Sequence, residues 1–126
     1  MKRALIALAA LALPGTALAQ PEAAEAFGDR QADLVLLAAR LGTLHRLHQV
    51  CHPEEEADKF RRALMGIIPL EVPKGSTRLD MISAFNGGYR DAASQHAICG
   101  REARADYAGA AEAALVVTER LYAPFR

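Results

Sequence analysis

The sequence has no tryptophan, only two cysteines and no excess of charge of either sign. Its 15 lysines and arginines balance 15 aspartates and glutamates, so it lacks the basic surplus that would hold nucleic acid or an anionic membrane surface. Strand-like alternation, internal repeats and low-complexity tracts are also missing. No motif of a reaction centre is recognisable. What is present is the pattern of one small helical domain.

The N-terminus has the features of a secretory signal peptide. It reads MKRALIALAALALPGTALAQ, with a basic start, a short apolar run, a Pro-Gly break and an A-x-A-like site that ends at Ala19. The apolar run is too short to span a bilayer, and no later apolar stretch is long enough to do so. We therefore expect residues 1–19 to be cleaved off after Ala19, which leaves residues 20–126 as a single periplasmic domain. No cysteine directly follows the cleavage site, so a lipid anchor is not indicated there.

Apolar residues recur with helical spacing through most of the predicted domain. Pro53, followed by three glutamates, suits the first turn of a helix, and Gly100 suits the end of another. We expect helices over residues 29–51, 53–69, 77–99 and 102–122. The predicted fold is all-α, a small antiparallel bundle of about four helices.

Three of the four histidines lie in the stretch LHRLHQVCHPEEE. His45 and His48 continue the apolar stripe of the first helix, so they should point into the protein. They have two interpretations: polar groups that hydrogen-bond across a helix interface, or metal ligands three residues apart on one helix. His96 is the one other imidazole that could complete a three-histidine site. His52 precedes a proline and should leave the face of His48.

The two cysteines have a simpler interpretation. In an oxidising compartment Cys51 and Cys99 should pair with each other, because exported cysteines seldom stay reduced. The bond would join the ends of the first and third helices. It would close a loop of about 49 residues and stabilise the fold by about 4 kcal/mol. A catalytic cysteine is not indicated, since the adjacent histidine in the sequence does not provide nucleophile and base geometry.

The stretch FNGGYR places two glycines inside the third helix, where each costs about 1 kcal/mol relative to alanine. The helical pattern turns Phe85 and Tyr89 inward and Gly87 and Gly88 toward solvent. Close packing, a local kink or contact with a partner could each offset the cost. Close packing is the more frequent explanation for a helix glycine, but it explains a solvent-facing glycine poorly, and this shifts some weight toward a partner surface or a local break. The candidate binding surface comprises Asn86, Gly87, Gly88, Arg90, Glu71 and Arg78.

These features together resemble a known family. The order LGTLHRLHQVC, FRRALM, a glutamate and an arginine around a Pro/Gly loop, FNGGY and a second cysteine is similar to an uncharacterised family of small exported proteobacterial proteins, a domain of unknown function with an FN-x-GY motif. The resemblance implies export, a helical fold and a Cys51–Cys99 pair, and it carries no known activity or ligand. His48 and His52 do not belong to the motif, which argues against a family-wide metal role.

Two classes of function follow from the sequence. The first is a non-catalytic binding or adaptor module of the cell envelope, without a cofactor, whose partner is another periplasmic or envelope protein. The alternative is a periplasmic metal-binding protein that uses His45, His48 and His96. An enzyme ranks third, because solvated ion pairs account equally well for the glutamates and arginines.

Overall fold

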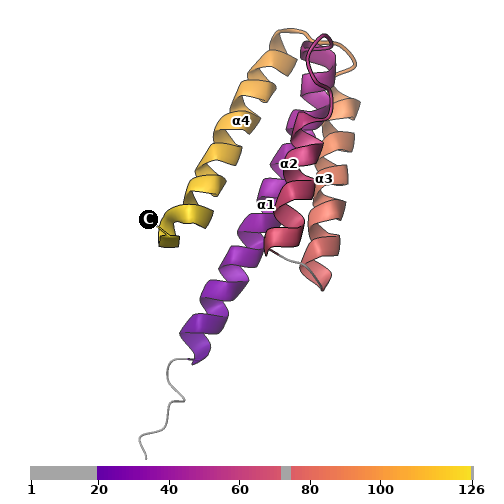
Figure 1. Cartoon of the computed structure of the whole chain (residues 1–126). Coiled ribbons are helices and arrows are strands. Elements are labelled where there is room, and N and C mark those ends of the chain that lie inside the picture. The colour runs from indigo at the N-terminus through magenta and orange to yellow at the C-terminus, as the bar shows by residue number, and fades with distance from the viewer. Residues whose placement is uncertain (1–19, 72–74, 126) are drawn as a thin grey trace, which may run out of the picture.

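The structure, a computed structural model, describes residues 20–71 and 75–125. The predicted signal peptide lies outside these residues. Four helices and a short 3₁₀ turn make up the described chain (Figure 1), and no strand occurs in it. They are α1 (Gln20–Cys51), α2 (Lys59–Glu71), α3 (Ser76–Gln95), α4 (Arg101–Tyr122) and η2 (Ala123–Phe125). The predicted all-α bundle is confirmed.

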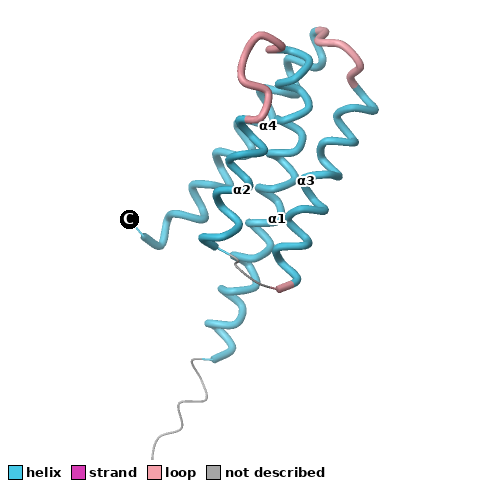
Figure 2. Tube along the Cα trace, turned by 45° about the vertical axis from the view of Figure 1, so that its right-hand side comes forward, coloured by secondary structure: helices cyan, strands magenta, loops and turns pink. Residues whose placement is uncertain are grey.

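Helix α1 is the centre of the bundle. It packs against α2, α3 and α4, while these three helices barely touch one another. Successive helices alternate in direction, so that α1 and α3 run parallel (Figures 1 and 2). Residues 21–29, at the N-terminal end of α1, extend beyond the bundle and are exposed. Because the core is built around α1, grooves can form in the spaces between the outer helices.

The apolar stripe predicted for α1 is its buried face. Leu34, Leu37 and Leu41 are each at most 7% exposed. They meet side chains from all three outer helices in one core cluster, which includes Leu44, Leu64, Ile68, Met81, Phe85, Ala110, Ala114, Val117 and Leu121. The small residues of α4 let this helix lie close to α1. Helical periodicity was therefore a sufficient signal for the buried faces of α1 and α4, but the predicted start of the first helix at residue 29 is wrong, because α1 begins at Gln20.

The predicted start of α2 at Pro53 is wrong. Residues 52–58 form turns, and the helix begins at Lys59. The chain needs this segment to reverse direction between α1 and α2, and its backbone is held by a buried side chain of α1, described below. Pro69 does not end the helix, which continues to Glu71. A proline this close to the end removes one backbone hydrogen bond without stopping the last turn.

The predicted end of α3 is also too late. The helix ends at Gln95, and His96 to Gly100 form the linker to α4. Before α3, Gly75 adopts φ 101°, a left-handed conformation that side chains rarely tolerate. The tight entry to α3 thus depends on glycine.

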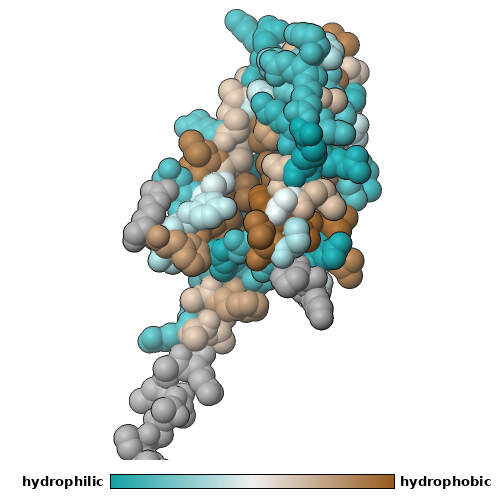
Figure 3. Space-filling model, viewed as in Figure 1, coloured by the Kyte–Doolittle hydropathy of each residue, from teal (hydrophilic) through white to brown (hydrophobic). Residues whose placement is uncertain are grey.

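The two ends of the bundle differ in surface character. Figure 3 shows a mostly hydrophilic upper end, where the 52–58 turns lie, and hydrophobic residues lower on the same face. This upper end also carries the cysteines and histidines that the sequence singled out.

Candidate functional site

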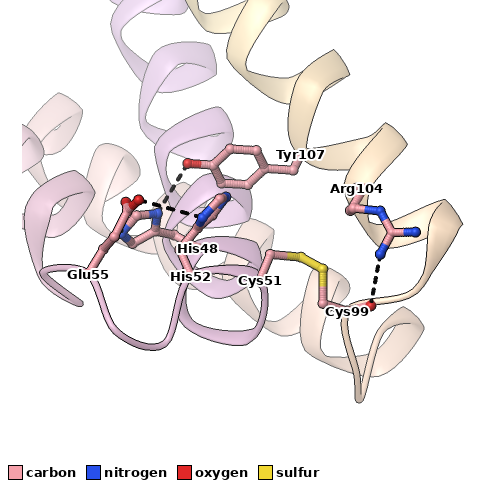
Figure 4. The surroundings of a disulfide bond; sticks show 7 residues. All are labelled: His48, Cys51, His52, Glu55, Cys99, Arg104 and Tyr107. Carbon is pink, nitrogen blue, oxygen red and sulfur yellow. Dashed lines mark hydrogen bonds and ion pairs between the residues drawn. A yellow bond between two sulfur atoms is a disulfide. The ribbon is translucent and has the colours of Figure 1, made fainter.

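The disulfide closes the upper end of the bundle. Cys51 is the last residue of α1 and Cys99 lies in the linker between α3 and α4, with their Cα atoms 4.9 Å apart (Figure 4). The predicted pair is confirmed. Arg104 of α4 donates a hydrogen bond to the Cys99 carbonyl at 3.3 Å, so the linker is also held from its other side.

His48 is fully buried beside this disulfide and joins three parts of the chain. Its Nε2 lies 3.0 Å from the Glu56 carbonyl oxygen, and its Nδ1 lies 3.1 Å from the Tyr107 hydroxyl (Figure 4). A carbonyl can only accept, so Nε2 must carry the hydrogen. In the neutral imidazole Nδ1 then accepts from the Tyr107 hydroxyl. His48 thereby connects α1 to the 52–58 turns and to α4, which confirms the interface interpretation.

Burial lowers the pKa of His48 below its usual value, and the positive charge of Lys59 lowers it further. The Glu55 carboxylate, with Oε2 3.7 Å from Nε2, opposes this shift. Glu55 also lies 3.6 Å from Nδ1 of His52, whose ring stacks on His48 with centroids 5.3 Å apart. Helix α1 ends before His52, as expected. The prediction that the His52 side chain leaves the face of His48 is wrong. The turn folds the ring back over the helix end.

His45 is buried one turn earlier on α1, at 6% exposure. Its ring packs between the rings of Phe85 and Tyr89, with centroids 5.5 and 5.6 Å away. Gln49 donates to its Nε2 at 3.4 Å and accepts from the Tyr89 hydroxyl at 3.0 Å. Burial lowers the pKa of His45 as well. This imidazole is part of the α1–α3 interface.

His96 has a different partner. Its Nε2 lies 2.6 Å from Oδ2 of Asp106, which links the end of α3 to α4. The three imidazoles proposed for a metal site are thus held by separate partners. Within the described residues, no three histidine, cysteine, aspartate or glutamate side chains come together in a group that could hold a metal ion. The three-histidine site of His45, His48 and His96 is not assembled.

The buried histidines predict a loss of stability in mild acid. Because the folded pKa of His45 and His48 lies below the usual 6.5, the unfolded chain binds more protons below that pH. Their contribution is complete above pH 6.5 and is lost as the pH falls toward the folded pKa. Each can cost up to about 1.4 kcal/mol per pH unit. Urea unfolding at pH 7.5 and 5.0 should therefore show a lower free energy of unfolding at pH 5.0.

A His48→Gln variant is the control for this prediction, because an amide can still donate to the Glu56 carbonyl. The variant should depend less on pH than the native protein, and the difference isolates His48. Asp33 does not interfere: its hydrogen bond with Arg120 lowers its pKa below 3.8, so its contribution is lost only in stronger acid. Equal pH dependence in the two proteins would contradict the assignment of a neutral, buried His48.

One residue of the candidate binding surface, Gly88, does not face solvent as predicted. A Cβ on Gly88 would lie 2.2 Å from the Ala39 carbonyl oxygen, and one on Gly42 would lie 1.9 Å from the Phe85 carbonyl oxygen. Gly88 therefore packs directly against α1, and its predicted solvent exposure is wrong. The α3 face that meets α1 is centred on Met81 and Phe85, which rotates Gly88 into the interface.

The other residues of the candidate binding surface do not share one role. Glu71 accepts a hydrogen bond at 2.5 Å from Arg30, which also donates to the Leu121 carbonyl at 2.7 Å. Arg30 thus fastens α1 both to Glu71 of α2 and to the end of α4. A Cβ on Gly87 would meet nothing within 4 Å. Asn86, Arg90 and Arg78 are exposed.

A groove between α3 and α4, with α1 as its floor, was not expected from the sequence. It encloses about 500 Å³ and is called the α3–α4 groove below. Its lining comprises Arg40, Thr43, Leu47, Asp91, Ala92, Gln95, His96, Ala105, Asp106, Gly109, Ala110 and Ala113. The one signal in the sequence was the small residues Ala105, Gly109 and Ala113, four residues apart on α4. They indicate space beside α4, but they do not indicate which helix forms the other wall of the groove.

These features define a four-helix protein that is locked at one end by a disulfide and carries a lateral groove. Residues 30–125 match the family described as a protein of unknown function, DUF2385. The chain belongs to this family. No curated protein and no solved structure is similar enough to match it. None of the helices in the described residues combines the length and apolar character needed to cross a membrane.

Proposed function

We propose that the protein is an exported, periplasmic binding or adaptor module of the cell envelope, and that its partner binds in the α3–α4 groove. The observation that carries this proposal is the groove itself. Its volume of about 500 Å³ lies in the range of ligand sites. Within the described residues, no hydrogen bond or ion pair engages the side chains of Arg40, Asp91 or Gln95, which line it.

Binding is favoured over catalysis by the use of the other polar groups. His48, Tyr107 and the Glu56 carbonyl hold the turns to α4. Arg120 forms two hydrogen bonds with Asp33, at 2.6 and 3.2 Å, and holds α4 to α1. These groups stabilise the fold, whereas, in the described part of the chain, Arg40, Asp91 and Gln95 of the groove have no such role. Recognition is the chemistry that such free groups support directly.

Export is supported by two observations that are independent of the groove. The N-terminal sequence has the pattern of a signal peptide, and the two cysteines form a disulfide. Structural disulfides persist in oxidising compartments such as the bacterial periplasm. Both point to the same compartment.

The proposal predicts that a residue at position 109 contacts the partner in living cells. Gly109 lies in the groove with nothing within 4 Å of an added Cβ, so a photo-crosslinking side chain should fit there without unfolding the protein. We expect a covalent adduct with a partner polypeptide, recovered from the periplasmic fraction. We also expect Gly109→Leu to remove the function of the protein in a deletion strain, because the added side chain fills the groove.

Gly66 is the matched control. It is also a helix glycine with open space around its Cβ position, but it lies on α2, away from the groove. The same photo-crosslinking side chain there should give no adduct, and Gly66→Leu should stay active. Equal adducts at both positions, or a fully active Gly109→Leu, would refute the groove as the binding site. Recovery of the chain in the cytoplasm with residues 1–19 still attached would refute export.

A further inference from the structure

The α3–α4 groove is closed at one end and open at the other. At its closed end the 2.6 Å contact between His96 and Asp106 joins the two walls, and the Cys51–Cys99 disulfide fastens the linker between the walls to the end of α1. Away from this end α4 diverges from α3 (Figures 1 and 2). An occupant that lies along the groove must therefore be narrower at the end near the disulfide.

The charged groups of the groove are separated along its length. Since a Cβ on Gly42 would touch Phe85, Arg40 lies near the level of residue 85 on the parallel helix α3. Asp91 is about six residues closer to the closed end, a distance of about 9 Å at the rise of an α-helix. Asp106 lies at the closed end itself. Among the described residues, the two unpaired charged groups of the groove are thus the cationic Arg40 toward its open end and the anionic Asp91 toward its closed end.

The width of the groove favours an extended occupant. A helix with its side chains is about 10–12 Å across and would not fit at the closed end, where a single His96–Asp106 contact spans the walls. An extended segment is narrower, but its backbone N–H and C=O groups need partners. The Gln95 amide can supply both donors and acceptors. The small residues Ala105 and Gly109 on the opposite wall leave room for the chain.

From this arrangement we infer that the groove binds an extended peptide segment of a partner protein, with a basic side chain toward Asp91 and an acidic side chain toward Arg40. This inference rests on the proposed function and adds the chemistry of the partner. An extended chain advances about 3.3 Å per residue, so the two charged residues should lie about three positions apart.

The probe for this inference is a displayed library of random eight-residue peptides, selected on the purified, oxidised protein. The selected peptides should share a basic and an acidic residue about three positions apart. On an Arg40→Glu variant the acidic residue should be replaced by a second basic one. A peptide selected on the native protein should bind Arg40→Glu about tenfold more weakly, because an attraction becomes a repulsion.

Arg90→Glu is the matched control, since Arg90 is an exposed arginine that does not line the groove. It should select the same peptides as the native protein. Thermal melting of both variants checks that the fold is retained, as expected for exposed side chains. Failure to enrich peptides, enrichment without the charge pair, or a pattern that Arg40→Glu leaves unchanged would each overturn the inference.

A Gly109→Leu variant separates this inference from the proposed function. If it abolishes peptide binding while the selected peptides lack the charge pair, the groove is the binding site and the inferred chemistry is wrong. If the selected peptides bind Gly109→Leu as well as they bind the native protein, they do not occupy the groove, and the inference fails. The cellular crosslink at position 109 then decides the proposed function by itself.

Discussion

Gly88→Ala should destabilise the protein by at least about 3 kcal/mol, whereas Gly87→Ala, one residue earlier in the same helix, should not destabilise it. The added Cβ at position 88 would lie 2.2 Å from the Ala39 carbonyl oxygen and 3.1 Å from the Thr43 nitrogen. These are backbone atoms of α1, which cannot move aside like a flexible side chain. Relief of the contact would push α3 away from α1 and open the core around Phe85.

Gly87 provides a control in the same sequence context. Its Cβ position is open, so alanine there should stabilise the helix by about 0.4–1 kcal/mol. Gly42→Ala should behave like Gly88→Ala, since its Cβ would meet the Phe85 carbonyl oxygen from the α1 side. Urea unfolding of the three variants gives the comparison. Similar stabilities for the Gly87 and Gly88 variants would show that the two helices are not in backbone contact.

The Gly42 and Gly88 contact also shows where sequence periodicity reaches its limit. The buried stripes of α1 and α4 could be predicted because each has several large or closely spaced apolar residues on one face. In α3 the pattern was centred on Phe85 and Tyr89, and it missed Met81, which is fully buried. A small rotation of the helix decides whether Gly88 faces solvent or α1. That rotation depends on how two helices cross, which one helix's sequence does not determine.

The candidate site, too, could be predicted only in part. The inward direction of His45 and His48 followed from the stripe of α1, and pairing of the cysteines followed from their number and from the predicted export. The hydrogen bonds of His48 could not be predicted, because they use the 52–58 turns and Tyr107, which are distant in sequence or irregular in structure. The α3–α4 groove is a property of three helices together. Its polar residues appear on an individual helix as ordinary exposed positions.

Removal of the disulfide is the second change with a large expected effect. Cys51 and Cys99 are 48 residues apart in sequence, and the loop they close should stabilise the folded state by about 4 kcal/mol through the lost entropy of the unfolded chain. A double Cys51→Ala, Cys99→Ala variant should lose that amount in urea unfolding. Reductant should destabilise the native protein by a similar amount and leave the variant unchanged.

The disulfide should matter for binding as well as for stability, because it holds the closed end of the α3–α4 groove. Cys99 lies in the linker that follows His96, so its release frees the segment that positions the His96–Asp106 contact. The large core cluster around α1 does not contain this linker, although Cys51 and Cys99 pack against the smaller cluster of Leu47, Ala92 and Ala103. The helices should therefore persist in the reduced protein at neutral pH. We therefore expect reduced protein with native helical content by circular dichroism but weaker binding of groove peptides. Unchanged peptide affinity after complete reduction would show that the linker does not shape the groove.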